Sequence, residues 1–191
     1  MKLHKKIDYN SPVILSFALL SFASLLLGYI TNGYTTQKFF CVYRSSLFDF
    51  TTYIRLFGHV LGHANLAHYA NNMMLMLLVG PMLEEKYGSA SLLKMIVITA
   101  LVTGLINTIF FSTGLLGASG IVFMMIILSS VTSVENGKIP LTLIIVVILY
   151  MGDQIVNGLF TADNISQMTH IIGGVCGGFF GMAEAKRKPG V

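Results

Sequence analysis

The sequence predicts an all-α membrane protein, a bundle of six transmembrane helices with a long interfacial first loop. Of its 191 residues, 54% are hydrophobic and 10% are charged, whereas soluble domains carry about 25% charged residues. Apolar runs of about 20 residues, enough to cross a bilayer, recur along the chain, and basic residues gather at their ends. This length leaves room for six spans in a single membrane domain (residues 1–191, core about 12–185) and for no separate soluble domain.

The first predicted span covers residues 12–30 and follows a basic flank. It is longer than the core of a signal peptide, about 7–15 residues, and ends Gly-Tyr-Ile-Thr-Asn, so we expect it to remain uncleaved. Residues 32–58 form a long loop rich in Phe and Tyr. Aromatic side chains settle at the level of lipid headgroups. We therefore expect this loop to lie at the membrane interface, to pack on the outer helix ends, or both.

Turn residues separate the remaining spans. The second span (66–83) ends at Glu84-Glu85-Lys86-Tyr87-Gly88, where Gly88 suits a helix C-terminus. The third covers residues 92–111, and the fourth runs from Gly117-Ala118-Ser119-Gly120 to about residue 134. After a turn at 135–138, Pro140 fits the first position of a fifth span that reaches about residue 160. A polar loop (161–167) leads to the sixth span, residues 168–183.

The distribution of basic residues predicts the topology. With the N-terminus inside, nine fall in inner segments and three in outer ones: Lys2, Lys5, Lys6, Lys86, Lys94, Lys138, Lys186, Arg187 and Lys188 against Lys38, Arg44 and Arg55. Lys and Arg are enriched on the cytoplasmic side of membrane proteins. We expect a multi-pass protein of the cell membrane with both termini cytoplasmic. The net charge of +4 reflects these helix ends and not nucleic-acid binding.

Four polar side chains inside the spans are candidate functional residues, because such groups are costly in a bilayer. They are His68 and Asn72 in the second span, Ser119 in the fourth and His170 in the sixth. His68, Ser119 and His170 each lie sixteen residues before the inner boundary of their helix, roughly 24 Å above it at 1.5 Å per residue. Asn72 lies one turn deeper, on the same face as His68. Three helices thus bring polar groups to one level.

Small residues indicate how two of these groups can meet. His170, Gly173 and Gly177 lie on one face of the sixth span, and small residues at that spacing let membrane helices approach closely. The alternative is ordinary packing in a glycine-rich helix. Ser119, in turn, could be no more than a helix N-cap.

Acyl transfer is the chemistry these groups could perform. A serine hydroxyl becomes nucleophilic when an adjacent base, usually histidine, takes its proton. The developing oxyanion then needs hydrogen-bond donors aimed at it. Ser119 and His170 supply the nucleophile and the general base, while the Ser119 amide, His68 and Asn72 can supply the donors.

A metal site is the competing interpretation of the histidines. His59 and His63 have the i, i+4 spacing of zinc ligands, but the sequence holds no His-Glu-x-x-His motif and no acidic ligand close by. Both could instead hydrogen-bond to loop and helix ends. Cys41 and Cys176 belong to no Cys-x-x-Cys or Cys/His pattern. We expect neither a metal nor a cofactor.

The pattern resembles the rhomboid intramembrane serine proteases, over roughly residues 54–183. The residues that carry the resemblance are His59-x-x-x-His63-x-x-x-x-His68-x-x-x-Asn72, Glu84-x-x-x-Gly88, Gly117-Ala118-Ser119-Gly120 and His170-x-x-Gly173-x-x-x-Gly177.

The resemblance implies the compact six-helix bacterial form of the rhomboid fold and a serine endopeptidase activity. It implies Ser119 as nucleophile, His170 as general base, and His68 and Asn72 with the Ser119 amide as the oxyanion hole. It further implies cleavage of transmembrane protein substrates in or near their membrane segment, within the lipid bilayer and without a cofactor. Oligomeric state stays open.

The chain departs from the family pattern at three positions. Ile54 precedes Arg55 where the family often has Trp, Phe123 stands where a Tyr often packs on the catalytic histidine, and Thr169 precedes His170 in place of Ala. Asp153, in the fifth span near the level of the site, is a further candidate that could orient His170 or line a water-filled entry.

Two other functions compete with the protease. A non-catalytic rhomboid-like protein would bind membrane clients, but such proteins usually lack the serine and histidine that this chain retains. A transporter built from inverted repeats would show paired broken helices, which spans four and six do not.

Overall fold

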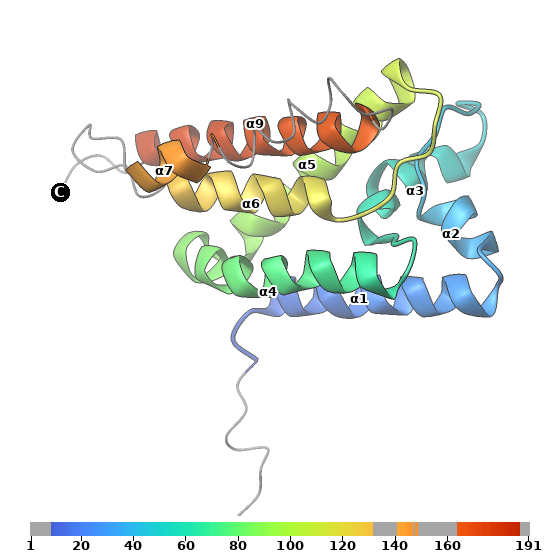
Figure 1. Ribbon diagram of the computed structural model, residues 1–191, viewed down its shortest axis with the longest axis horizontal. Helices are drawn as coiled ribbons and strands as arrows, with labels where there is room; N and C mark the ends of the chain where they lie inside the picture. Colours follow the sequence, from blue (N-terminus) through green and yellow to red (C-terminus); the bar gives the residue numbers. More distant parts are fainter. Residues whose placement is uncertain (1–8, 132–140, 147, 149–163, 188–191) are drawn as a thin grey trace, which may run out of the picture.

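The computed structural model describes residues 9–131, 141–146, 148 and 164–187 (Figure 1). Within these ranges the chain is helical apart from its connections and one isolated antiparallel β-bridge, Val42 to Leu115. The helices are α1 (Pro12–Ile30), α2 (Tyr34–Phe39), α3 (Phe50–Gly58), the short 3-10 helix η2 (His59–Leu61), α4 (Leu66–Tyr87), α5 (Ser89–Phe110), α6 (Ser119–Val131), α7 (Leu141–Val146) and α9 (Asn164–Arg187). The all-α prediction is confirmed for the described chain.

Helix α6 lies at the centre of the bundle. Every residue from Gly120 to Leu128 is buried, as expected of a helix that is apolar on all sides. It contacts α4, α5, α7 and α9. In Figure 1, α9 runs alongside α6 on one side, and α4 and α1 lie together on the other. Helix α6 is therefore packed between other helices.

Two of the described helices, α1 and α5, are long and apolar enough to cross a membrane by length and composition. Helix α4 is as long as α5, at 22 residues, but it is less apolar because His68, Asn72 and Glu84 lie within it. Apart from α7 and residue 148, the predicted fifth span lies outside the described residues. The structure thus tests the six-span prediction only in part.

Glu84, near the end of α4, caps the N-terminus of α1. Its carboxylate accepts hydrogen bonds from the Val13 N–H at 2.9 Å, the Ile14 N–H at 3.1 Å and the Ser89 hydroxyl at 2.7 Å. The first N–H groups of a helix have no partner within the helix, and they attract negative charge. The side chain of Ser11 at the N-cap makes no capping bond, so Glu84 takes its place and joins α1, α4 and α5.

The expected continuous loop over residues 32–58 contains two helices instead, α2 and α3. Helix α3 forms where Asp49 caps it, its side chain accepting the Thr51 N–H at 2.9 Å. Aromatic side chains on and beside α3 point outward, and Phe48, Phe50, Tyr53 and Phe57 are all exposed. This exposure is what an interfacial segment requires, since such side chains favour the headgroup level.

Two predicted helix boundaries are corrected. Helix α4 continues through residue 87, one turn beyond the predicted end at 83. Helix α9 begins at Asn164, so residues 164–167 belong to a helix and not to the predicted polar loop. Polar residues are favoured in the first turn of a helix, where they can satisfy free N–H groups, so a polar composition does not exclude helix there.

Candidate active site

Helices α6 and α9 meet through glycines. A methyl group added to Gly173 would lie 3.0 Å from the Gly120 Cα atom and would overlap the Gly120 carbonyl. One added to Gly177 would overlap the carbonyl of Met124. The two backbones touch where a larger residue would separate them, which is how small residues act between membrane helices. The close approach expected from the spacing of Gly173 and Gly177 is present.

Ser119 is the first residue of α6 and lies at one end of this glycine contact. The loop that precedes it is held by backbone hydrogen bonds. Val42 and Leu115 exchange two bonds, of 2.9 and 2.8 Å, and the Gly117 N–H donates to the His59 carbonyl at 2.9 Å. Gly117 has φ +125°, a conformation that glycine adopts without the strain of a side chain. The backbone before Ser119 is thus held by hydrogen bonds to Val42 and to His59.

Asn107, in the last turn of α5, also fixes this loop. It is buried, and its side-chain Nδ2 donates to the carbonyls of Val42 and Thr113, both at 3.1 Å. Sequence reasoning missed this residue. The rule that polar residues inside spans are suspects applies to Asn107 as it does to Asn72, and it could have found it.

The His68 imidazole lies against the loop before Ser119. A Cβ atom on Gly117 would be 2.8 Å from both Cε1 and Nε2 of His68, so only glycine leaves room for the ring. The Ala64 N–H points at His68 Nδ1 at 3.4 Å, a long contact that makes Nδ1 the acceptor. In that tautomer Nε2 carries the proton. His68 therefore presents an N–H donor at Gly117, two residues from Ser119.

The His170 imidazole stacks on Phe123. The ring centroids are 4.3 Å apart and the planes differ by 6°. Phe123 lies four residues after Ser119, so the two side chains project from the same face of α6. Next to His170, Thr169 packs on Gly120, with its Cγ2 3.0 Å from the position of a Cβ there. The imidazole thus lies over the face of α6 that begins with Ser119.

Asn72 is buried one turn below His68, as the i, i+4 spacing predicts. Its Nδ2 donates to the His68 carbonyl at 3.0 Å. One of its two amide N–H groups is therefore engaged within α4, which the sequence does not predict, and the other is the donor available to a ligand.

His59 and His63 lie within hydrogen-bond distance of backbone carbonyls at helix ends, which was the alternative to a metal site. His59 Nδ1 lies 3.1 Å from the Arg55 carbonyl and its Nε2 lies 3.2 Å from the Thr103 hydroxyl. His63 Nδ1 lies 3.2 Å from the Leu61 carbonyl. Burial lowers the pKa of each histidine to about 4, so both are neutral near pH 7. In the described ranges, no three His, Cys, Asp or Glu side chains gather as a metal site would require.

The structure accounts for two of the departures from the family pattern. Arg55 is buried and donates to Ser45, Thr51, Thr52, Asp49 and the Lys38 carbonyl, with its guanidinium 4.4 Å from the centre of the Tyr43 ring. It organises the first loop without help from Ile54, which is exposed. Thr169, for its part, is a packing residue between α9 and α6. Asp153 lies outside the described residues.

Comparisons with known proteins show the family of this chain. The Rhomboid domain family matches residues 51–187, from α3 to the end of α9. Among curated proteins, the Rhomboid protease GluP of Bacillus subtilis (strain 168) is 33% identical over 135 residues, which cover 68% of this chain and 25% of that protein. This chain thus matches about a quarter of the relative's length. Because the family match spans most of the chain and includes His68, Ser119 and His170, the protein belongs to the rhomboid family.

Proposed function

We propose that this protein is an intramembrane serine endopeptidase that cleaves transmembrane protein substrates in or near their membrane segment. Ser119 is the nucleophile and His170 the general base. The observation that carries the proposal is the junction at the start of α6, where the His170 ring covers Phe123 one turn from Ser119 and the His68 ring lies against Gly117. Family membership and a relative named as a rhomboid protease support it.

The reaction follows from the roles of these groups. His170 takes the proton of the Ser119 hydroxyl as the oxygen attacks the scissile carbonyl carbon, and an oxyanion forms. The Ser119 N–H, the His68 Nε2–H and the free Asn72 N–H donate to that oxyanion. His170 then gives its proton to the leaving amine, which departs and leaves an acyl-enzyme. Water then attacks the ester as His170 takes its proton, the bond from the acyl carbon to the Ser119 oxygen breaks, His170 returns the proton to that oxygen, and the carboxylate product is released.

The proposed topology is a single membrane domain of six spans in the compact bacterial form, with both termini in the cytoplasm. The excess of basic residues in the inner segments supports this orientation, and the apolar helices α1 and α5 support the spans. The common level of His68, Ser119 and His170 then lies in the outer part of the bilayer, from which water can reach the acyl-enzyme. The lipid bilayer and substrate helices are the expected partners.

Labelling by a fluorophosphonate probe tests the nucleophile directly. The purified wild-type protein in detergent should be labelled, and Ser119→Ala should not. Ser130→Ala is the matched control, because Ser130 lies in the same helix and donates to the Ile126 carbonyl of its own helix. Cleavage of a single-span reporter should be lost in Ser119→Ala and His170→Ala and kept in Ser130→Ala. Unlabelled, inactive wild-type protein would contradict the proposal and favour a client-binding protein.

A further inference from the structure

Asn71 lies beside Asn72 on α4, but the two side-chain amides differ in their surroundings. Asn72 is buried and donates to the His68 carbonyl of its own helix at 3.0 Å. Asn71 is exposed, and its side chain forms no hydrogen bond within the part of the chain that the structure describes. An asparagine side chain can donate two hydrogen bonds and accept two. The amide of Asn71 is therefore available to another molecule.

The depth of Asn71 in the proposed topology makes this exposure costly. The residue precedes Glu84, near the inner end of α4, by thirteen positions. At 1.5 Å per residue it lies roughly 20 Å above the inner boundary and about 10 Å below the outer edge of the hydrocarbon core. An asparagine side chain is too short to reach the headgroups from there. Polar groups at this depth are rare and mark functional positions.

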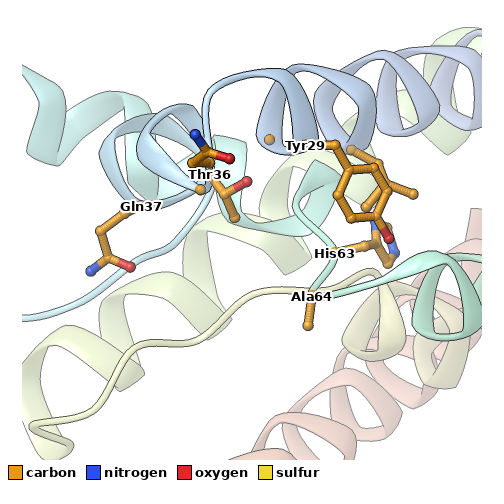
Figure 2. A pocket seen from close by; sticks show the side chains of 9 residues that line it. Tyr29, Thr36, Gln37, His63 and Ala64 are labelled. Carbon is orange, nitrogen blue, oxygen red and sulfur yellow. The ribbon is translucent and has the colours of Figure 1, made fainter.

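The opposite side of α4 is covered by α1. Tyr69 donates to the Ala18 carbonyl of α1 at 3.2 Å. Tyr29, at the end of α1, accepts the Leu66 N–H at 3.0 Å, and Figure 2 shows it beside the segment that leads into α4. Asn71 follows Tyr69 by two positions, which is about 200° around an α-helix. The side chain of Asn71 therefore points away from α1.

The side of α4 that carries Asn71 adjoins the candidate active site. His68, which lies against Gly117, is about 60° from Asn71 around the helix. Ala67 is exposed one turn before Asn71 and carries only a methyl group, so a second backbone can approach α4 closely here. Because α1 closes the other side, a membrane segment can reach His68 and Ser119 across the side that carries Asn71.

Peptide cleavage inside a membrane creates a need for such an amide. A scissile carbonyl in a transmembrane helix is already bonded to an N–H group of that helix, so the helix must be opened before Ser119 can attack. Opening frees neighbouring N–H and C=O groups, and in hydrocarbon no water is present to pair with them. The Asn71 amide can satisfy one of each, because its Nδ2 donates and its Oδ1 accepts.

We propose that Asn71 binds the opened backbone of the transmembrane substrate, next to the scissile bond. Its Nδ2 donates to a freed substrate carbonyl, and its Oδ1 accepts a freed substrate N–H. The residue takes no part in proton transfer, and it stabilises the unwound segment that the active site requires. This inference rests on the proposed function, to which it adds a substrate-binding group.

Two measurements on the Asn71→Leu protein test the inference. Fluorophosphonate labelling of Ser119 requires no opened helix, so its rate should match that of the wild type. Cleavage of a single-span reporter should fall about three- to tenfold in kcat/KM, the usual effect of one lost hydrogen bond. Asn71→Gln keeps the amide, and its reporter cleavage should stay within about twofold of wild type.

Met74→Leu is the matched control, because Met74 is exposed on the same side of α4 and the exchange is between two apolar side chains. It should leave both measurements unchanged. Full reporter cleavage in Asn71→Leu, an equal loss of cleavage in Met74→Leu or Asn71→Gln, or slower labelling in Asn71→Leu would overturn the inference alone. Wild-type protein that is neither labelled nor active would instead overturn the proposed function, and this inference with it.

Discussion

Replacing Gly173 with alanine should separate the two helices that carry Ser119 and His170. The added methyl group would lie 2.9 Å from the Gly120 carbonyl carbon and 3.0 Å from its Cα, whereas ordinary contacts are 3.4–4 Å. Both obstacles are backbone atoms and cannot rotate away, so α9 must shift by about 0.5–1 Å. Overpacking of this kind lowers stability by about 1–3 kcal/mol. A misplacement near 1 Å can reduce catalysis about a hundredfold.

Gly178→Ala is the matched control on the same helix. A methyl group there would lie 4.0 Å from its nearest neighbour, Ile127 Cγ2, so the helices need not move. We expect fluorophosphonate labelling and reporter cleavage to fall about ten- to a hundredfold in Gly173→Ala and to stay near wild type in Gly178→Ala. Labelling is measured at a temperature where unfolding assays show both variants folded. Wild-type labelling in Gly173→Ala, or equal losses in both, would refute the reasoning.

Three other changes test the surroundings of the site. Glu84→Gln should lower the free energy of unfolding by about 1–2 kcal/mol, because it removes the charge at the α1 N-terminus. Glu85→Gln changes an exposed neighbour and should leave that free energy unchanged. Equal effects of the two changes would argue that Glu84 does not cap α1. Phe123→Leu should reduce the cleavage rate about two- to tenfold, because the ring that stacks on His170 is lost, and KM should change little. An unchanged cleavage rate would exclude a role of Phe123 in positioning His170. Wild-type stability should decline as the pH falls from about 6.5 to about 4, because buried His59 stays neutral in the folded state while the unfolded chain takes up a proton. Thermal unfolding across that window should show a shallower decline in His59→Gln, and parallel profiles would contradict this assignment.

Most helices could be predicted because apolar runs of membrane length leave few alternatives to a helix. The bounds of α1, Pro12–Ile30, agree with the prediction. The start of α9 at Asn164 does not, because polar residues suit both a loop and the first turn of a helix. Helices α2 and α3 were missed because aromatic composition indicated the interface and obscured local signals such as the Asp49 cap.

The candidate site depends on two kinds of information. The common depth of His68, Ser119 and His170 follows from counting residues along helices, and the close contact at Gly173 follows from residue size. Side-chain direction does not follow from either. The bond from Asn72 to the His68 carbonyl is local to α4 and depends on which rotamer the side chain adopts, whereas the bond from Asn107 to the Val42 carbonyl joins segments that are distant in the sequence. The catalytic roles themselves stay a prediction until labelling tests them.

The carboxylate of Glu84 also bears on the order in which the protein is assembled. It accepts hydrogen bonds from the N–H groups of Val13 and Ile14 in α1, which precede it by 71 and 70 residues in the chain. At translation rates of about 5–20 residues per second, several seconds separate the synthesis of the first helix from that of its acceptor. The first N–H groups of α1 therefore find their carboxylate acceptor only after α4 has been made. In the interval they must donate to water or to lipid headgroups.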